Sequence, residues 1–234
     1  MNIKHNINYF KKSDALKYIG IALMVGGGIL FIFAYGLLYL VSLALLPIGI
    51  TFLLLGVSGK SNDADIDACI KEETKNLYVK LEDSFKYKKR ILKHLTPETL
   101  EGYEYNDTVM IKRTKEGALR SSEYTKAIVY ILSDELYITE RNVSLTSQNT
   151  RSNLYEIPYD MIKSVDIVRE DKKLTFLGKV YETNTIHLVI KYGMGTVLSL
   201  PMQNDVRSLQ IAEKINNVIK NYKQVQADEA SKGA

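Results

Sequence analysis

The chain is 234 residues long, with 31 basic and 27 acidic residues and a formal net charge of +4. After Thr96 the two signs balance, 18 basic against 19 acidic residues, so the sequence lacks the basic bias of a nucleic-acid-binding domain and we expect no nucleic-acid partner. The single cysteine, Cys69, excludes an internal disulfide, in agreement with a reducing compartment.

An uncharged apolar run dominates the N-terminal quarter. Residues 18–58 are 41 positions without Asp, Glu, Lys, Arg or His, whereas one membrane-spanning helix needs about 20. The run predicts a helical hairpin in a membrane, with spans at about 16–34 and 38–57 and a turn at Tyr35-Gly36. One long helix containing Pro47 is the alternative, but about 40 helical residues would measure about 60 Å, twice the hydrocarbon thickness. A cleaved signal peptide has a much shorter apolar region.

Lysines flank the apolar run and are absent from its turn. Four precede the first span and one follows the second: Lys4, Lys11, Lys12, Lys17 and Lys60. Because positive residues stay on the cytoplasmic side, both ends of the hairpin are predicted to face the cytoplasm. The sequence thus predicts a multi-pass protein of the cell (inner) membrane, with a cytoplasmic N-terminus and a cytoplasmic C-terminal domain.

Residues 61–96 are predicted to form one amphipathic connecting helix. Apolar residues recur there at spacings of three, four or seven, the period of a helical face: Ile66, Ile70, Leu77, Leu81, Phe85, Leu92 and Leu95. Thr96-Pro97 ends the pattern, because proline lacks a backbone donor and disfavours helical geometry in the residue before it.

Residues 97–223 are predicted to form one β domain closed by a helix. Short β-branched and aromatic stretches separated by turn residues predict an antiparallel sandwich or barrel. The expected strands are 108–113, 127–132, 136–139, 154–157, 164–168, 180–181, 186–192 and 196–200. From residue 205 the apolar period becomes helical, which predicts a helix over 205–222 with Asn204 as its N-cap. The polar residues 224–234 are predicted to be a disordered tail.

Two segments resemble bacterial pleckstrin-homology-like (PH-like) and GRAM-like domains. Val-Tyr-Ile-Leu-Ser-Asp-Glu-Leu-Tyr-Ile-Thr at 129–139 is similar to their opening hairpin, and Tyr-Glu-Ile-Pro-Tyr-Asp-Met-Ile-Lys-Ser-Val-Asp-Ile at 155–167 is similar to their next strand, turn and strand. About seven strands followed by one helix, over roughly 107–222, is also the element order of that family. The resemblance implies a PH-like fold and a binding module beside a membrane hairpin. It implies no lipid-site residue, because the turn Ser133-Asp134-Glu135 is short and acidic where phosphoinositide-binding PH domains have a basic loop.

A basic cluster lies late in the connecting helix: Lys86, Lys88, Lys89, Arg90 and Lys93. Each basic residue beside an anionic leaflet contributes about 1 kcal/mol, so a helix lying flat would let the cluster contact anionic lipid headgroups. A helix standing off the membrane would place it about 35–40 Å away, beyond a Debye length of about 8 Å. There the cluster would be solvated or would pair with protein. The sequence leaves these interpretations open.

The membrane-proximal half of the same helix is predicted to self-associate. Its apolar stripe needs a partner, because such a patch on a solvated helix marks an interface. We expect this stripe, made of Ile66, Ile70, Leu77 and Leu81, to meet the same residues of a second copy. The prediction is a homo-oligomer.

The sequence shows no recognisable catalytic or metal-binding constellation. Its three histidines lie far apart in the chain: His5, His94 and His187. There is no phosphate loop, serine nucleophile motif or Cys/His metal spacing. Asp63, Asp65 and Asp67 open like a calcium loop, but Ala68 and Thr74 stand where that loop needs glycine and glutamate. We expect no enzymatic activity, no cofactor and no metal.

These elements together predict an α+β protein. A membrane hairpin within residues 1–60 precedes the connecting helix of 61–96 and the PH-like β domain of 97–223. The predicted function is a membrane-anchored cytosolic binding or scaffolding module that recruits an unknown protein partner and self-associates. The alternative is a membrane-surface lipid sensor that uses the basic cluster at 86–94.

Overall fold

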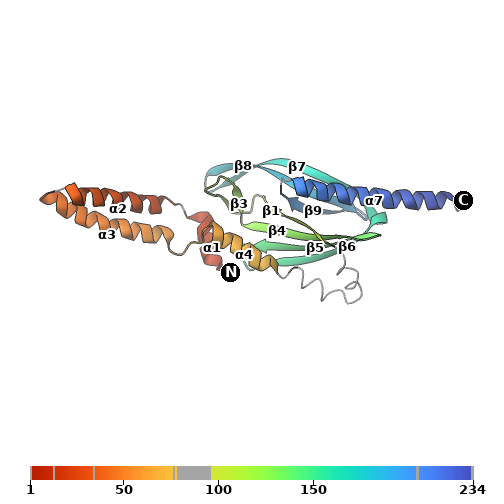
Figure 1. Cartoon of the computed structure of the whole chain (residues 1–234), viewed down its shortest axis with the longest axis horizontal. Helices are drawn as coiled ribbons and strands as arrows, with labels where there is room; N and C mark the ends of the chain where they lie inside the picture. The colour runs from red at the N-terminus through yellow and green to blue at the C-terminus, as the bar shows by residue number, and fades with distance from the viewer. Residues whose placement is uncertain are drawn as a thin grey trace. The chain divides into compact units, whose positions relative to one another are not determined.

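The computed structural model describes residues 2–12, 14–33, 35–75, 77, 96–203 and 206–232 (Figure 1). The chain divides into two compact units, a helical unit over Asn2–Ala64 and a β unit over Asp65–Ala234. Each unit has its own packing.

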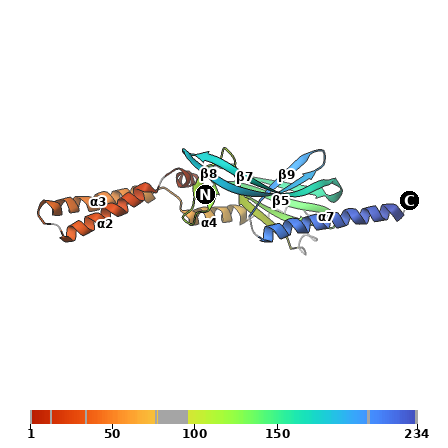
Figure 2. The ribbon, with the colours of Figure 1, turned by 90° about the horizontal axis from the view of Figure 1, so that it is seen from above.

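The helical unit is built from α1 (Ile3–Lys11), α2 (Ala15–Phe33) and α3 (Leu37–Val57). α2 and α3 run side by side as a hairpin (Figure 2). The predicted spans are confirmed as helices over residues 16–33 and 38–57, and both helices are long and apolar enough to cross a membrane. Their outward side chains are uncovered, for example Ile32 at 72% and Phe33 at 75% exposure, whereas the core helix of a soluble protein would be buried.

Glycines let α2 and α3 approach each other closely. A β-carbon on Gly20 would lie 2.5 Å from the backbone nitrogen of Leu53, and one on Gly49 would lie 2.8 Å from Cγ of Met24. Both distances are shorter than carbon atoms tolerate, so these positions need glycine. A β-carbon on Gly28 would instead meet nothing within 4 Å. Gly20 and Gly49 therefore serve packing within the hairpin, as expected of membrane helices.

α1 fastens the chain before the hairpin to the chain after it. Hydrogen bonds of three side chains join them: Asn8 Nδ2 to the Gly59 carbonyl (2.6 Å), Ser61 Oγ to Asn6 Oδ1 (2.7 Å) and Tyr9 Oη to Asp63 Oδ1 (2.5 Å). An ion pair between Lys60 and Asp14 adds to them. α1 was not predicted, although Ile3, Ile7 and Phe10 recur at helical spacing; its buried face also includes the polar Asn6.

Gly49→Ala should separate α2 from α3, because the added methyl group would overlap with atoms of Met24. Overpacking of this kind costs about 1–3 kcal/mol. Thermal unfolding of the full chain in detergent, followed by helical circular dichroism, should show a lower Tm. Gly28→Ala is the matched control and should leave the Tm unchanged or slightly raised, since alanine favours a helix. Equal effects of the two substitutions would contradict the packing.

The β unit has two main antiparallel sheets and a short ribbon. One sheet has the strand order β1-β4-β5-β6, the other has the order β7-β8-β9, and β2 pairs with β3 alone. The strands are β1 (Glu98–Tyr103), β2 (Ile111–Arg113), β3 (Leu119–Ser121), β4 (Glu123–Ile131), β5 (Glu135–Ser144), β6 (Arg151–Pro158), β7 (Ile162–Phe176), β8 (Lys179–Tyr192) and β9 (Thr196–Met202). The predicted hairpin over 127–139 is confirmed, with Val129 opposite Ile138.

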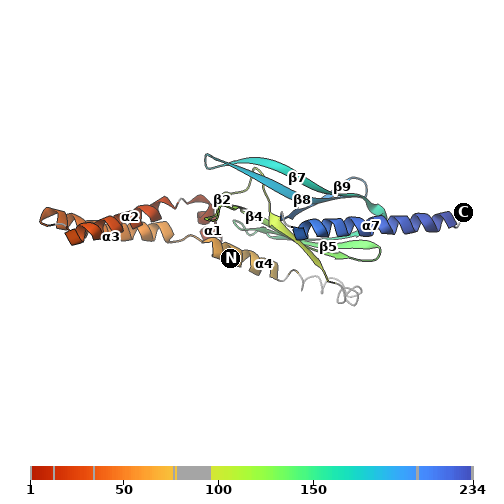
Figure 3. The ribbon, with the colours of Figure 1, turned by 45° about the horizontal axis from the view of Figure 1, so that its top comes forward.

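The main core lies between the two sheets and α7 (Val206–Lys232). α7 runs between the splayed sheets (Figure 3). Ile138 of β5, Leu188 of β8, Leu200 of β9 and Ile215 of α7 are all fully buried in this core. The C-terminal helix thus covers apolar faces of both sheets, as its apolar period predicts.

Tyr159 ties the β4–β5 turn to the core. It lies in the short helix η1 (Tyr159–Met161), its hydroxyl donates to the Leu132 carbonyl (2.7 Å), and its backbone N–H donates to the Asp134 carbonyl (2.9 Å). Its ring packs edge-on against Tyr222 of α7, with centroids 5.2 Å apart. Burial raises the pKa of the Tyr159 hydroxyl, so this side chain stays a neutral donor.

α4 (Asp63–Lys75) lies along the other face of the four-stranded sheet. Glu73 of this helix pairs with Arg141 of β5 at 3.1 Å, and Leu77, just after α4, packs against Ile128 and Tyr137. The helix predicted over 61–96 is thus confirmed for Asp63–Lys75, while residues 78–95 lie outside the described part of the chain.

β7 and β8 are much longer than predicted. β8 runs unbroken where two strands, 180–181 and 186–192, were expected. The polar stretch Glu182–Asn184 hid the continuity, because it has no apolar alternation. Its backbone pairs with Asp171–Lys173 of β7, and this ladder needs no buried side chains.

Two further differences concern the ends of the β unit. β1 was not predicted, because Leu100 is its only buried residue. α7 continues to Lys232, so the prediction of a disordered tail over 224–234 is wrong for residues 224–232. The extension buries no apolar face. Good helix formers and an exposed bond from Gln224 Nε2 to Asp228 Oδ1 (3.0 Å) support it instead.

Candidate functional site

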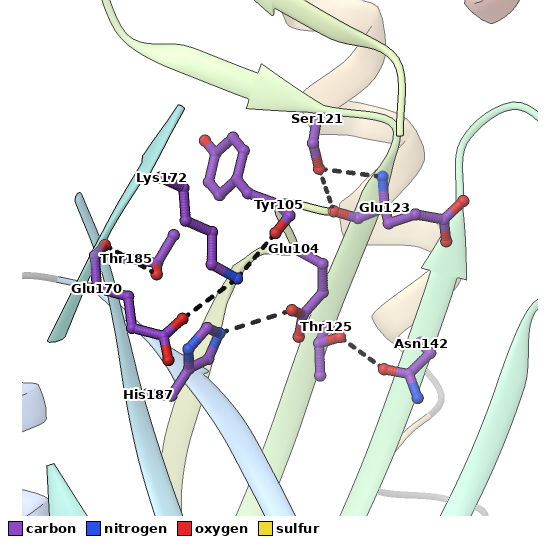
Figure 4. Close-up of polar contacts among 10 residues, drawn as sticks. All are labelled: Glu104, Tyr105, Ser121, Glu123, Thr125, Asn142, Glu170, Lys172, Thr185 and His187. Carbon is purple, nitrogen blue, oxygen red and sulfur yellow. Dashed lines mark hydrogen bonds and ion pairs between the residues drawn. The ribbon is translucent and has the colours of Figure 1, made fainter. Parts of the chain in front are cut away.

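A polar cluster adjoins one end of the main core, where the chain leaves β1 (Figure 4). Glu104 and Tyr105 follow β1, Lys172 lies on β7, and His187 lies on β8. The alternation of β8 places His187 on the face opposite the core residue Leu188. The cluster therefore combines groups from three elements that only the fold brings together.

Lys172 connects β7 to the segment after β1. Its ammonium group donates to the Tyr105 carbonyl at 3.0 Å and lies 3.6 Å from a carboxylate oxygen of Glu170. Tyr105 in turn donates its hydroxyl to the Leu119 carbonyl of β3 at 2.7 Å. Burial raises the pKa of the Tyr105 hydroxyl to about 12, although the Arg120 charge acts in the opposite direction. Tyr105 is therefore a structural donor rather than an acid.

His187 and Glu104 face each other, with 3.6 Å between Nε2 and the nearest carboxylate oxygen. The His187 side chain is 10% exposed and that of Glu104 is 32% exposed. Thr185, two residues before His187 on the same strand face, donates to the Glu170 carbonyl at 3.3 Å. The pair thus offers one donor and one acceptor at the edge of solvent.

Glu123 is the half-buried carboxylate next to this cluster. Its backbone carbonyl accepts from the Glu104 N–H at 3.0 Å, and its side chain accepts from Ser144 Oγ at 2.8 Å. Burial raises the pKa of the Glu123 carboxyl, the Ser144 hydrogen bond partly opposes that shift, and the Glu104 charge adds to it. The fold therefore favours the protonated form of Glu123 more than water does.

A hollow of about 470 Å³ opens beside the polar cluster. Thr185 and His187 line one side of it, Tyr103 and Tyr105 another. Its walls offer hydroxyl, imidazole and aromatic surface, which suit a ligand with both polar and apolar parts.

A second hollow of about 570 Å³ lies between α4 and the sheet. The two hollows share the edge-on pair Tyr103 and Tyr124, whose centroids are 5.1 Å apart, as well as Gln203. They therefore meet along this aromatic pair, and we call the combined surface the tyrosine groove. Burial is the main reason that the pKa of Tyr124 is raised, so its hydroxyl stays neutral.

The wall of the tyrosine groove beside α4 is predominantly basic. It contains four cationic and two anionic side chains: Lys71, Lys75, Arg120, Lys126, Asp67 and Glu101. Two ion pairs, Arg120 with Asp67 at 2.8 Å and Lys126 with Glu101 at 3.0 Å, use both carboxylates. Lys71 and Lys75 are both exposed, and Lys75 lies 3.9 Å from a carboxylate oxygen of Glu72, so Lys71 supplies the excess positive charge of this wall.

The residues predicted to self-associate are covered in the described structure. Ile66, Ile70 and Leu77 are 0%, 8% and 1% exposed. The expectation that this stripe is uncovered is therefore wrong for these three residues. The outer face of the four-stranded sheet is itself apolar, and Leu77 covers part of that face. Leu81 lies outside the described residues, and self-association stays a prediction.

The basic cluster of Lys86, Lys88, Lys89, Arg90 and Lys93 also lies outside the described residues. Contact of this cluster with lipid or protein stays a prediction.

Metal binding finds no support among the described residues, where no group of three His, Cys, Asp or Glu side chains is arranged around one point. Two of the aspartates that resemble a calcium loop have other partners. Tyr9 donates to Asp63, and Arg120 pairs with Asp67.

Sequence reasoning missed the tyrosine groove and most of the polar cluster. Glu104, Lys172 and His187 are separated by 68 and 15 positions, so no spacing rule joins them. Lys172 gave no signal either, because it lies in the charged run 169–173, outside the strand predicted over 164–168. His187 lies in the strand predicted over 186–192, and its place in a strand is confirmed by β8.

No family model, curated protein or solved structure matches this chain.

Glu123→Gln should make stability less dependent on pH. An acid whose pKa is higher in the folded than in the unfolded state binds its proton more tightly when folded, so stability falls as pH rises from the ordinary value of 4.5 through the folded pKa. The glutamine keeps an acceptor for Ser144 and removes this loss. Urea unfolding of the full chain in detergent should therefore favour the variant more at pH 7 than at pH 4.

Glu116→Gln, at an exposed position in the β2–β3 turn, is the control for loss of one negative charge. If the stability difference between Glu123→Gln and the parent protein is the same at both pH values, the carboxyl of Glu123 is not destabilised by burial.

Proposed function

We propose that this chain is a membrane-anchored binding module in which the α2–α3 hairpin spans the bilayer twice and the β unit recruits a protein segment on the cytoplasmic side. The observation that supports recruitment most directly is the tyrosine groove, a hollow surface with an aromatic floor and a basic wall. The proposal assigns the chain no catalytic step.

The anchor is supported by the outward apolar faces of α2 and α3. Water would surround these faces at high free-energy cost, because burying apolar surface contributes about 25 cal/mol per Å². α1 holds both ends of the hairpin together through Asn6, Asn8 and Tyr9. Because the two ends of the hairpin lie together, they are on the same side of the membrane, as two crossings require. The flanking lysines favour the cytoplasmic side for both ends.

A PH-like fold for the β unit is part of the proposal. Setting the β2–β3 ribbon aside, four antiparallel strands precede three more and then one C-terminal helix that packs between the sheets. This order supports a PH-like fold, but it makes the hairpin at 129–139 the second and third strands of the domain, whereas the resemblance implied the opening hairpin. The β2–β3 ribbon would then be an insertion after the first strand, and it supplies Leu119 and Arg120 to the tyrosine groove.

The chemistry of the groove favours an acidic partner segment with an aromatic or aliphatic anchor. Tyr103, packed edge-on against the buried Tyr124, gives an aromatic surface with little conformational entropy to lose. Lys71 and Lys75 on the rim would steer negative charge toward it. A protein segment fits this surface better than a small molecule, because both hollows are open and they share lining residues, among them Tyr103, Tyr124 and Gln203.

Site-specific photo-crosslinking in native membranes tests this proposal. A benzoylphenylalanine probe at Gln203, which borders both hollows, should give a discrete protein adduct. Lys71→Glu with Lys75→Glu should reduce the adduct about tenfold, the ratio expected from a loss of ~1.4 kcal/mol when two surface charges are reversed.

The same probe at Leu154, an exposed residue of β6, is the matched control. An adduct shared by both probe positions, or one that charge reversal leaves unchanged, would contradict recruitment by the tyrosine groove.

A further inference from the structure

The β7–β8 hairpin ends in an exposed apolar tip. Phe176 pairs with Lys179, so Leu177 and Gly178 alone form the turn. Leu177 is 61% exposed and Val180 is 56% exposed. We call residues 172–182 the finger. The last β7–β8 pair that includes a main-core residue joins Arg169 and Ile186. From this pair the two strands continue for seven residues, about 23 Å, to the tip.

The residue at the tip is an unusual choice for its backbone conformation. Leu177 has φ = 50° and Gly178 has φ = 73°, the two positive values that a tight hairpin turn of this kind requires. Asn, Asp or Gly is favoured at the first position, and Leu177 is the only non-glycine residue with positive φ in the described chain. A leucine that is strained and exposed contributes little to folding, which points to a role outside the fold.

The lower part of the finger is held rigidly. Leu174 is buried in a small separate core with Val109 and Ile111. Phe176 and Tyr181 pack against the same core from the finger. The tip is therefore presented by a fixed support, and its exposure is built into the structure of the β unit.

The finger points to the end of the β unit at which α4 begins. The small core that supports the finger includes Ile111 of β2, and Leu119 of β3 packs against it. Arg120, next to Leu119, pairs with Asp67 in the second turn of α4. Figures 1 and 3 show the β7–β8 turn at this end of the sheets. Only five residues, 58–62, separate α3 from α4, and they extend over at most about 18 Å.

The charge of the finger suits an anionic lipid surface. Its exposed lysines are Lys173 and Lys179, against one acid, Glu182, while Lys172 is held by Tyr105 and Glu170. Lys173 pairs with Glu182 at 3.2 Å, both side chains being at least 70% exposed, and Lys179 is exposed beside the tip. Apolar side chains with lysines behind them are the composition of segments that enter the headgroup region of a bilayer.

We propose that the tip of the finger, Leu177 with Val180, inserts into the headgroup region of the membrane that holds the α2–α3 hairpin. This inference rests on the membrane anchoring proposed above. The contact gives the β unit a second attachment to the bilayer and so limits its orientation, with the tyrosine groove between α4 and the sheet kept near the membrane.

Fluorescence quenching by lipid measures this contact in the full chain. The Cys69→Ser protein is reconstituted in vesicles of phosphatidylcholine and phosphatidylglycerol, and single cysteines carry a nitrobenzoxadiazole label at position 177, 194 or 32. Met194 is the matched control, since it is the exposed apolar residue in the turn at the opposite end of β8. Ile32 on α2 reports the anchor.

The label at 177 should be quenched by spin-labelled lipid to at least about half the extent at 32, while the label at 194 stays unquenched. Quenching at 32 without quenching at 177 would overturn the finger contact and leave the anchor standing. Absence of quenching at 32 would overturn the anchor, and the finger contact with it. Equal quenching at 177 and 194 would show unspecific adsorption and would also overturn the inference.

A variant of the turn separates lipid contact from folding. Leu177→Asn supplies a residue that favours positive φ, so the Tm of the β unit should be equal or higher. Lipid contact is measured with a label on Val180→Cys. This label should lose most of its quenching in the Leu177→Asn protein relative to the protein that keeps Leu177. A lower Tm, or unchanged quenching, would contradict the assignment of Leu177 to the membrane contact.

Discussion

The structure depends first on the need to shield 41 consecutive uncharged residues from water. Pairing α2 with α3 shields only their inner faces, and glycines at positions 20 and 49 allow the helices to approach closely enough to do so. The outer faces stay uncovered, including residues as large as Ile32 and Phe33. A lipid bilayer is the environment in which this surface is stable. α1 binds the segment after α3 and so keeps both ends of the hairpin together.

The β unit must bury the apolar faces of its two sheets, and the elements that cover these faces also form its outer surface. Each main sheet has an apolar inner face, and α7 completes the core that they share. The four-stranded sheet is apolar on its other face as well, where Leu77 covers Ile128 and Tyr137. Because α4 and the β2–β3 ribbon stand beside this sheet, the tyrosine groove forms between them. The ribbon also supports the finger, so the proposed protein contact and the proposed lipid contact share one structural support.

The sequence was sufficient where apolar residues follow a regular period. It predicted the paired helices, the β4–β5 hairpin and the inner part of α7, because each buries a continuous apolar face. It failed where polar residues do the packing or where pairing of the backbone alone stabilises an element. α1 buries Asn6 through a hydrogen bond, β8 continues through Glu182–Asn184 on ladder bonds, and α7 extends past Lys223 on helix propensity. The site residues Glu104, Lys172 and His187 meet only through the register of β7 with β8 and the exit of β1, which no linear spacing reveals.

The side of the membrane from which three positions can be labelled tests whether the hairpin spans the membrane with both of its ends on one side. In a Cys69→Ser background, single cysteines replace Lys12 before α2, Tyr35 in the turn and Met194 in the β unit, all exposed. A membrane-impermeant thiol reagent is then applied to sealed vesicles of each orientation. We expect the cysteines at 12 and 194 to react from the cytoplasmic side and the one at 35 from the opposite side only. Reaction of positions 12 and 194 from opposite sides would mean one crossing, and reaction of all three from one side would mean none; either result would contradict the anchored module described above.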